Sequence, residues 1–315
     1  MAPILSITVP VYNEEGMLPL AIDRLSGMLR EMIAGDVIHQ DSYLLFVDDG
    51  SSDKSWSILN DAYHADAKVR AIRLSRNFGH NNALLAGLMT VKDYCDVAIS
   101  IDCDLQQDLR AIPLFLNKYS SGSDIVFGIR NDRKTDGLVK KYTALGFYKL
   151  MQIMGVKMHA NHADYRLLSR RALHALAEYK EPNIFLRAVC VDMGFSNEVV
   201  YFDVVDREHG TSKYTLSKML KFAVDGIASF SAVPLRMISI LGVVIFCLSL
   251  VMALYVLIRT VLVGDTVPGW ASTVLPIYFL GGLQILCMGI VGEYLAQVYT
   301  AAKGRPRYIV EAELF

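Results

Sequence analysis

The sequence predicts an α/β fold with a mainly parallel sheet, followed by an interfacial amphipathic helix and two transmembrane helices. Three observations support this prediction. Short apolar strands alternate with amphipathic helical stretches over the first 130 residues. Two of these strands end in carboxylates, at Asp48 and Asp102. Two long stretches without charge, 237–258 and 266–292, each exceed the ~20 residues that cross a bilayer.

The individual elements follow from local patterns. Apolar runs predict strands at 4–9, 43–47, 69–74, 97–101 and 124–128. Helical spacing predicts four helices. The first covers about 17–33 and the third covers 83–89. The second begins after a cap at Ser52 or Asp53, and the fourth follows the strand at 97–101 and ends at residue 115. Because strand and helix alternate, right-handed crossovers should bring the loops together at one edge of the sheet.

Composition and motifs exclude several classes of function. The net charge of −1 gives no basic field, so we expect no nucleic-acid partner. No strand is followed by Gly-x-Gly-x-x-Gly, and a P-loop pattern is absent, which argues against a dehydrogenase and a P-loop NTPase. The five cysteines show no Cys-x-x-Cys spacing, so we expect reduced thiols. Residues 1–15 carry no signal-peptide pattern.

The stretch 97–108, VAISIDCDLQQD, predicts a metal site. A buried strand ends here at Asp102 and Asp104, where open α/β sheets place their ligands. Two neighbouring carboxylates repel each other unless a cation lies between them, and Mg²⁺ or Mn²⁺ prefers such oxygens together with substrate phosphates. Gln106 offers a third oxygen. The alternative is that both aspartates only cap the next helix.

The acidic edge also suits a nucleotide. Asp48 should lie on the same rim as Asp102, where carboxylates fit a uracil or ribose and a metal-bound diphosphate better than a bare anion. Cations follow from residue 130 onward, in the segments 130–141, 163–171 and 207–213. They either form a solvated surface or reach over the rim and hold a second, phosphate-bearing substrate.

The last third of the sequence predicts attachment to a membrane. Apolar residues recur at helical spacing over 216–227, which indicates a helix in the bilayer interface or a core-facing helix. Cations flank the two uncharged stretches on their outer sides, whereas the connecting loop has only Arg259. The positive-inside bias therefore places the large domain and the C-terminal tail in the cytoplasm.

An ordered set of motifs resembles a known family. PVYNEEG, VDDGSSD, RNFGH, IDCDLQ, GIR, DYRLLSRR, GTSKYTLSKML and GEYLAQVYTAAKGRPRYIV together resemble the polyprenyl-phosphate glycosyltransferases of glycosyltransferase family 2, such as bactoprenol glucosyltransferase and dolichol-phosphate mannose synthase. The resemblance covers nearly the whole chain. It implies a GT-A domain over 1–210, interfacial helices over 211–235, a transmembrane hairpin over 236–300 and a cytoplasmic tail over 301–315.

The resemblance also implies residue roles. The nucleotide would be held by Pro10, Tyr12, Asn13, Glu14 and Asp48. The metal, Mg²⁺ or Mn²⁺, would be bound by Asp102, Asp104 and Gln106. The donor or lipid phosphates would lie near Arg130, Lys140, Lys141, Arg166, Arg207, Ser212 and Lys213. Asp164 matches the candidate base, and Asp104 is assigned to catalysis as well.

Three positions depart from the family pattern. Residues 107–110, QDLR, replace the usual prolines after the metal motif. Ala163 replaces the Gly commonly found before Asp164, and Lys140 and Lys141 stand where a Lys-Arg pair is expected. The last change keeps the charge but loses a bidentate guanidinium.

The implied reaction is transfer of a sugar, with glucose preferred, from a UDP-sugar to undecaprenyl phosphate with inversion. An acceptor phosphate is already anionic, with a second pKa of ~6, so Asp164 is expected to orient a cation such as Arg166 more than to remove a proton. The implied setting is the inner leaflet of the bacterial inner membrane, with a multi-pass chain, a homo-oligomer such as a tetramer, and a downstream flippase and glycosyltransferase.

Two other functions stay open at this stage. A processive polysaccharide synthase shares the sheet and the Asp-x-Asp, but its Gln-x-x-Arg-Trp motif is missing around Trp56 and Trp270. A membrane-anchored nucleotide-sugar sensor would keep the fold without turnover.

Overall fold

The computed structural model describes residues 2–131, 162–181, 184–203, 233–263 and 270–315. The chain divides into two compact units. Unit 1 comprises Met1–Gln152, Lys157–Met219 and Arg305–Phe315, and unit 2 comprises Ile153–Val156 and Leu220–Gly304. Each unit is described by itself below.

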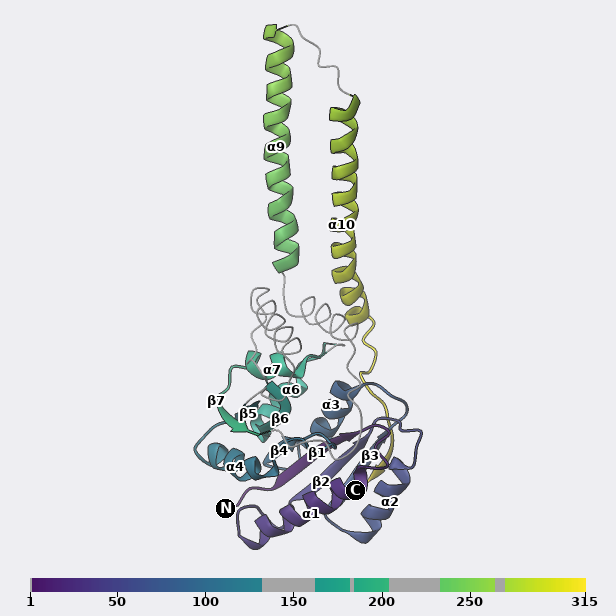
Figure 1. Ribbon diagram of the computed structural model, residues 1–315. Helices are drawn as coiled ribbons and strands as arrows, with labels where there is room; N and C mark the ends of the chain where they lie inside the picture. Colours follow the sequence, from purple (N-terminus) through teal and green to yellow (C-terminus); the bar gives the residue numbers. More distant parts are fainter. Residues whose placement is uncertain (1, 132–161, 182–183, 204–232, 264–269) are drawn as a thin grey trace. The chain divides into compact units, whose positions relative to one another are not determined.

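Unit 1 is built on an eight-stranded sheet with the order β7-β5-β6-β4-β1-β2-β3-β8 (Figure 1). The strands are β1 Leu5–Val11, β2 Tyr43–Asp48, β3 Val69–Leu74, β4 Val97–Ser100, β5 Ile125–Arg130, β6 His162–Ser169, β7 Asn197–Phe202 and β8 Val310–Leu314. The central strands β4, β1, β2 and β3 are parallel, and β5 pairs with β7 in parallel. The predicted mainly parallel α/β fold of the GT-A type is therefore confirmed.

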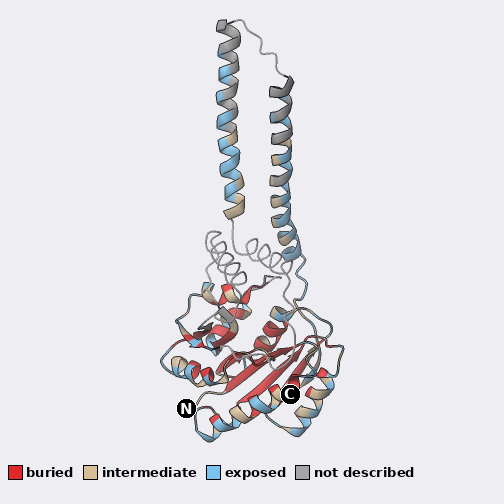
Figure 2. Cartoon of the chain, in the orientation of Figure 1, coloured by how far each residue is buried: buried red, intermediate tan, exposed pale blue. Residues whose placement is uncertain are grey.

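Helices cover both faces of this sheet. They are α1 Leu18–Ala34, α2 Ser55–Ala65, α3 His80–Val91, α4 Ile112–Ser120, α6 Arg170–Ala177 and α7 Leu186–Asp192, with a 3-10 turn, η1, at Leu109–Ala111. Every residue of β1, β2 and β4 is buried, as expected for strands that are covered on both faces (Figure 2). A cluster of buried apolar side chains joins α1 and α4 to one face of β1.

Helix α3 packs against the opposite face of β1. A Cβ atom at Gly87 would lie 2.4 Å from Thr8 Cγ2 and 2.8 Å from Val47 Cγ2. Only a residue without a side chain permits this close approach of helix and sheet. The loop before α3 carries part of the site described below.

Three strands were not predicted from the sequence. β6 lies in the cationic segment 163–171, for which the sequence predicted either a solvated surface or phosphate-binding cations, and Tyr165, Arg166 and Leu167 are all buried there. It runs antiparallel to both β4 and β5. β7 extends the sheet at one edge.

The third of these strands changes the predicted domain boundaries. The sequence suggested a separate tail over 301–315, but β8 pairs antiparallel with β3 and completes the sheet of unit 1. The chain therefore leaves unit 1, forms unit 2, and returns to add a final strand to unit 1.

Unit 2 contains two long helices, α9 Val233–Val263 and α10 Trp270–Ala302, which contact each other. Among the described residues, one stretch, Leu280–Ala302, is long and apolar enough to cross a membrane, and Val233–Ile245 is a shorter apolar segment. Large apolar side chains are exposed on both helices, among them Ile240, Val251, Ile285 and Met288. The predicted interfacial segment 211–235 lies outside the described residues except for its last three.

We expect Gly87→Ala to destabilise the protein, because the new methyl group would overlap two buried side chains. Overpacking of this kind costs about 1–3 kcal/mol, against a gain of about 1 kcal/mol in helix propensity. The midpoint of thermal unfolding of the purified full-length chain should fall. Gly27→Ala in α1 is the matched control, since no atom lies within 4 Å of its new Cβ, and it should unfold at or above the wild-type temperature. Equal midpoints for the two variants would contradict the close-packing argument.

Candidate active site

The candidate site lies at the carboxyl edge of the central strands. In the parallel register, Val11 of β1 is opposite Asp48 of β2, and Thr8 of β1 is opposite Ser100 of β4. The loops after these strands therefore start at the same edge, where open α/β sheets bind their ligands.

The loops after β1 and β2 brace each other. The Asn13 amide donates to Ser51 Oγ at 3.0 Å, and Asn13 Oδ1 accepts from the Ser52 amide at 2.9 Å. The Glu14 amide donates to Ser55 Oγ at 3.1 Å. Asn13 has a φ of 53°, a left-handed conformation that Asn tolerates better than most residues. The two loops thus form one fixed ledge.

The predicted nucleotide residues differ in how far they reach this ledge. Pro10 is buried within β1, and Asp48 is fully buried at 0% exposure, whereas the Tyr12 residue is 42% exposed. The Asp48 carboxylate accepts from the Ser51 amide at 3.1 Å, and Arg73 Nε lies 3.3 Å from its Oδ2. Burial raises the pKa of Asp48, against the opposing effects of Ser51 and Arg73. Arg73 was not singled out from the sequence.

Asp49 shapes the neighbouring loop. Its two carboxylate oxygens accept from the Phe78 amide at 2.7 Å and the Gly79 amide at 2.9 Å. Gly79 has a φ of 91°, which a residue with a side chain rarely adopts. This turn places His80 at the start of α3.

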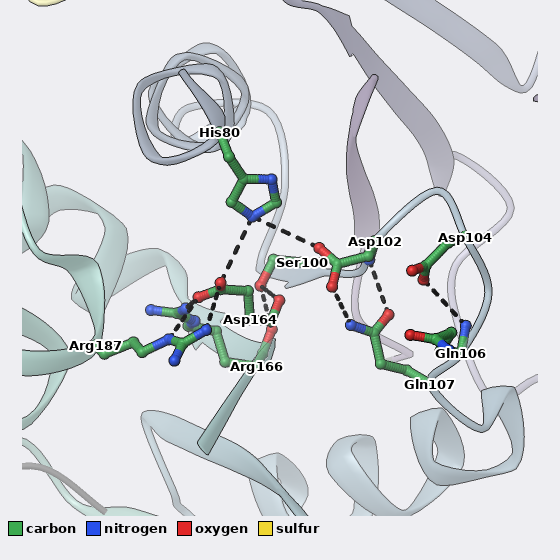
Figure 3. A network of polar contacts seen from close by, with 9 residues as sticks. All are labelled: His80, Ser100, Asp102, Asp104, Gln106, Gln107, Asp164, Arg166 and Arg187. Atoms are coloured by element: carbon green, nitrogen blue, oxygen red, sulfur yellow. Dashed lines mark hydrogen bonds and ion pairs between the residues drawn. The ribbon is translucent and has the colours of Figure 1, made fainter. Parts of the chain in front are cut away.

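The loop after β4 carries the predicted metal ligands (Figure 3). Gln107, which is buried, forms two bonds to Asp102: the Asp102 amide donates to its Oε1 at 2.9 Å, and its Nε2 donates to Asp102 Oδ2 at 2.6 Å. Asp104 Oδ1 accepts from the Gln106 amide at 3.2 Å. Leu105 has a φ of 50°, so the loop turns sharply between the two. Gln107, one of the residues in place of the family's prolines, therefore fixes Asp102.

Asp164 lies beside Asp102 because of the antiparallel pairing between β4 and β6. Ser100 pairs with Arg166, so the next residues outward, Asp102 and Asp164, face the same edge. Arg187 of α7 donates to both carboxylate oxygens of Asp164, with Nε 3.2 Å from Oδ1 and Nη2 2.9 Å from Oδ2. Arg166 Nη2 donates to the same Oδ1. Two guanidinium groups therefore surround this carboxylate.

His80 connects the two aspartates. Its Nε2 lies 3.6 Å from Asp102 Oδ1 and 3.6 Å from Asp164 Oδ2 (Figure 3). Desolvation favours the neutral imidazole, but the nearby carboxylates of Asp164 and Asp102 outweigh it and raise the pKa of His80 to about 9. A protonated imidazole thus lies between two carboxylates near neutral pH.

The two carboxylates have opposite electrostatic properties. Burial alone would raise the pKa of Asp164, but Arg187, His80 and Arg166 hold it well below the usual value for an aspartate. Burial raises the pKa of Asp102; His80 opposes this effect, whereas Asp164 and Asp104 add to it. Asp164 is therefore a poor general base, because its ionised form is already stabilised by cations.

The residues predicted to bind the donor or lipid phosphates fall into three groups. Arg166 is fully buried at 0% exposure, with Nη1 3.7 Å from Cys190 Sγ, so its charge is directed at Asp164 within the protein. Arg130 is half-buried at the end of β5. The others, Lys140, Lys141, Arg207, Ser212 and Lys213, lie outside the described residues.

The donor set at this edge fits a hard divalent cation. Over the described ranges, no cluster of three or more His, Cys, Asp or Glu side chains is arranged to hold a metal. Mg²⁺, however, usually takes one or two carboxylates and completes its shell with water and substrate phosphates. Asp102, Asp104 and the amide oxygen of Gln106 match that pattern. The pKa of Asp102 is raised first by burial and then by the neighbouring carboxylates of Asp164 and Asp104, and a bound cation would oppose both effects.

Sequence reasoning missed several residues that the structure brings to the site: Asp49, Arg73, His80, Gln107 and Arg187. The motif RNFGH contained a signal for His80, and QDLR contained one for Gln107. Arg187 follows from the packing of α7 against β6 and has no local signal.

Comparison with known proteins agrees with this arrangement. The family model described as Glycosyl transferase family 2 matches residues 6–177. YkoT, a glycosyltransferase of Bacillus subtilis strain 168, is 44% identical over 313 residues, which cover 99% of this chain and 93% of that protein. The bactoprenol glucosyl transferase of Shigella phage SfX is 35% identical over 309 residues, which cover 98% and 99% of the two chains.

We expect Arg187→Leu to destabilise the protein by about 1–3 kcal/mol, because it leaves the largely buried carboxylate of Asp164 with one cation fewer. Since the pKa of Asp164 is depressed in the folded state, this contribution is fully present above about pH 4 and is lost as the pH falls further. Thermal or urea unfolding at pH 7 measures the loss.

The control for this variant is Arg171→Leu, which breaks an exposed ion pair with Asp124 of 3.6 Å. Because the Arg171 side chain is 72% exposed, the loss should stay within about 1 kcal/mol. If the free energies of unfolding of the two variants fall by the same amount, the ion pair between Arg187 and Asp164 contributes no more to stability than an exposed one.

Proposed function

The chain belongs to glycosyl transferase family 2 and is a glycosyltransferase, and from this premise we propose that it transfers glucose from UDP-glucose to undecaprenyl phosphate, with inversion. The observation that carries the proposal is the acidic site beside Asp102 in a chain that is similar, over nearly its whole length, to proteins named bactoprenol glucosyl transferase. Polyprenyl phosphate as acceptor and glucose as the sugar come from those relatives.

The donor is proposed to bind along the braced ledge. Tyr12 offers an exposed ring for stacking, and Asn13 and Glu14 hold the ledge in shape through Ser51, Ser52 and Ser55. Pro10 and Asp48 support the same position from beneath, since both are buried. Preorganised backbone of this kind lowers the entropic cost of positioning two substrates.

The metal is proposed to be Mg²⁺ or Mn²⁺, held by Asp102, Asp104 and Gln106. When bound, it supplies a Lewis acid that offsets negative charge on the diphosphate leaving group. Gln107 holds Asp102 by its amide and its carboxylate at once, so the ligand is oriented before substrate arrives. His80 fixes the other oxygen of Asp102 relative to Asp164.

Asp164 is proposed to organise cations rather than to accept a proton. A phosphate acceptor is already anionic near neutral pH. Its attack on the anomeric carbon needs orientation and neutralisation of charge more than it needs a base. Through Asp164, the guanidinium groups of Arg166 and Arg187 are fixed beside the metal loop. The cations Arg130, Lys140, Lys141, Arg207 and Lys213, with Ser212, are proposed to bind the donor and lipid phosphates.

Two membrane crossings are proposed, by α9 and α10. Leu280–Ala302 supports one crossing, and the apolar segment Val233–Ile245 within the 31-residue α9 supports the other. The pairing of β8 with β3 adds an independent argument. Both ends of the helical segment must return to the same side of any membrane, so the number of crossings is even. The catalytic unit is then cytoplasmic at the bacterial inner membrane, beside the cations Lys303, Arg305 and Arg307.

The segment 211–235 is proposed to lie in the interface and admit the lipid phosphate from the inner leaflet. We also propose that the protein forms a homo-oligomer such as a tetramer. A flippase and a second glycosyltransferase would then use the lipid product.

We expect Asp102→Asn to reduce turnover more than about a hundredfold and to leave the chain folded. Membranes containing the full-length protein would be incubated with labelled UDP-glucose, undecaprenyl phosphate and Mn²⁺, and glucose-linked lipid would be measured. Asp108→Asn is the matched control in the same loop, because Asn caps a helical turn as well as Asp does and Asp108 only caps η1 and pairs with Arg110. Normal turnover of the Asp102 variant would show that the metal assignment is wrong.

A panel of nucleotide sugars tests the choice of donor. We expect wild-type membranes to form one labelled lipid, from UDP-glucose, with the anomeric configuration inverted. Excess chelator should stop its formation. A lengthening polymer would indicate a processive synthase instead, and nucleotide binding without any product would indicate a sensor.

A further inference from the structure

The final strand of the sheet contains an irregularity beside the donor ledge. In the pairing of β3 with β8, Arg73 is opposite Ala312, but Leu74 is opposite Val310. Glu311 is therefore the extra residue of a β-bulge. Bulges redirect a side chain out of the regular alternation and occur frequently near active sites.

The redirected side chain meets a residue of the ledge. Glu311 Oε2 lies 3.7 Å from Arg73 Nε, and the same Nε lies 3.3 Å from Asp48 Oδ2. Arg73 Nη2 also donates to the Ser51 carbonyl at 3.3 Å. One guanidinium thus joins the C-terminal strand to the two loops that follow β1 and β2, since Ser51 also braces Asn13.

The contact between Arg73 and Asp48 is close but poorly aligned. Within the part of the chain that the structure describes, neither Arg73 Nε nor Asp48 Oδ2 has a hydrogen bond of good geometry, although both atoms are buried. The direction of the guanidinium is therefore not fixed by Asp48 alone. The Glu311 carboxylate, 3.7 Å from the same nitrogen, adds a second electrostatic attraction on the guanidinium without a hydrogen bond.

The strand that carries Glu311 is anchored at both ends. The Ser75 amide donates to the Ile309 carbonyl at 3.0 Å on one side of the bulge. On the other side, Tyr63 Oη donates to the Phe315 carbonyl at 2.9 Å, and the Arg70 guanidinium lies 5.0 Å from the centre of the Phe315 ring. Glu311 is therefore held between two fixed points, even though its side chain is 53% exposed.

We propose that Glu311 is a positioning residue for the donor nucleotide, which acts through Arg73 on Asp48 and on the ledge at Ser51. This inference rests on the proposed function, because it assigns the nucleotide to that ledge. It makes the strand after α10 a part of the donor site. Removal of its charge should weaken nucleotide binding while the reacting groups at Asp102 and Asp164 stay unchanged.

The test compares Glu311→Gln with Glu313→Gln in the full-length protein. Glu313 is also exposed, lies on the same strand opposite Ile72, and serves as the matched control. We expect Glu311→Gln to raise the KM for UDP-glucose and the Kd for UDP with Mn²⁺ about three- to fivefold, with kcat and the KM for the lipid within twofold. Glu313→Gln should match the wild type.

A double variant separates positioning from a general effect on folding. Arg73→Gln should raise the same Kd, and adding Glu311→Gln to it should change nothing further, because the two residues act in series. Equal Kd values for the Glu311 and Glu313 variants, or independent additive effects of Glu311 and Arg73, would overturn the inference. Product formation by the wild type tests the proposed function separately, since the Kd for UDP needs no acceptor.

Discussion

Two carboxylates, Asp102 and Asp164, come to the same edge of the sheet from strands that run in opposite directions, and their mutual repulsion must be offset for the edge to form. The cations that offset it come from three elements: His80 from α3, Arg166 from β6 and Arg187 from α7. Each contact therefore depends on the correct packing of a different part of unit 1 (Figure 3). The site and the fold are linked through this charge balance.

The neighbouring cations offset the negative charge of Asp164 more fully than that of Asp102, and this difference suits the two carboxylates to different roles. Two guanidinium groups, those of Arg166 and Arg187, donate hydrogen bonds to Asp164, and its negative charge holds both of them in place. Asp102 receives one neutral amide from Gln107 and shares His80 with Asp164. Among the residues that the structure describes, Asp102 therefore has less compensating positive charge than Asp164. One acidic position becomes a fixed support for cations, and the other is suited to a divalent cation with its phosphate ligands.

Much of the sheet could be predicted because its central strands are buried on both faces and so appear as continuous apolar runs. β6 could not, because the charge of Arg166 interrupts such a run, and only the pairing with Asp164 explains a buried guanidinium there. β8 had a usable signal, since VEAEL alternates apolar and charged residues with the period of a strand. Its place next to a predicted transmembrane helix suggested a tail instead.

Local spacing likewise singled out Asp102 and Asp104, the proposed metal ligands, but not the residues that orient them. Asp102 and Asp104 are recognisable from their position after a strand. The contacts of His80 and Arg187 join residues that are distant in sequence, and they depend on strand register and helix packing. No local pattern contains that information.

The return of the chain to β3 also constrains how the molecule is assembled. Residues 220–304 are inserted between the seventh strand and the eighth, so they are not appended after a finished domain. Until β8 is made, β3 is an open edge strand with unpaired backbone groups, which is the feature that invites incorrect pairing. Since pairing across such a long separation is slow, we expect the sheet from β1 to β7 to form before β8 joins it. The last strand then closes the edge, and with Glu311 it brings a carboxylate to Arg73, beside the ledge where we propose that the donor binds.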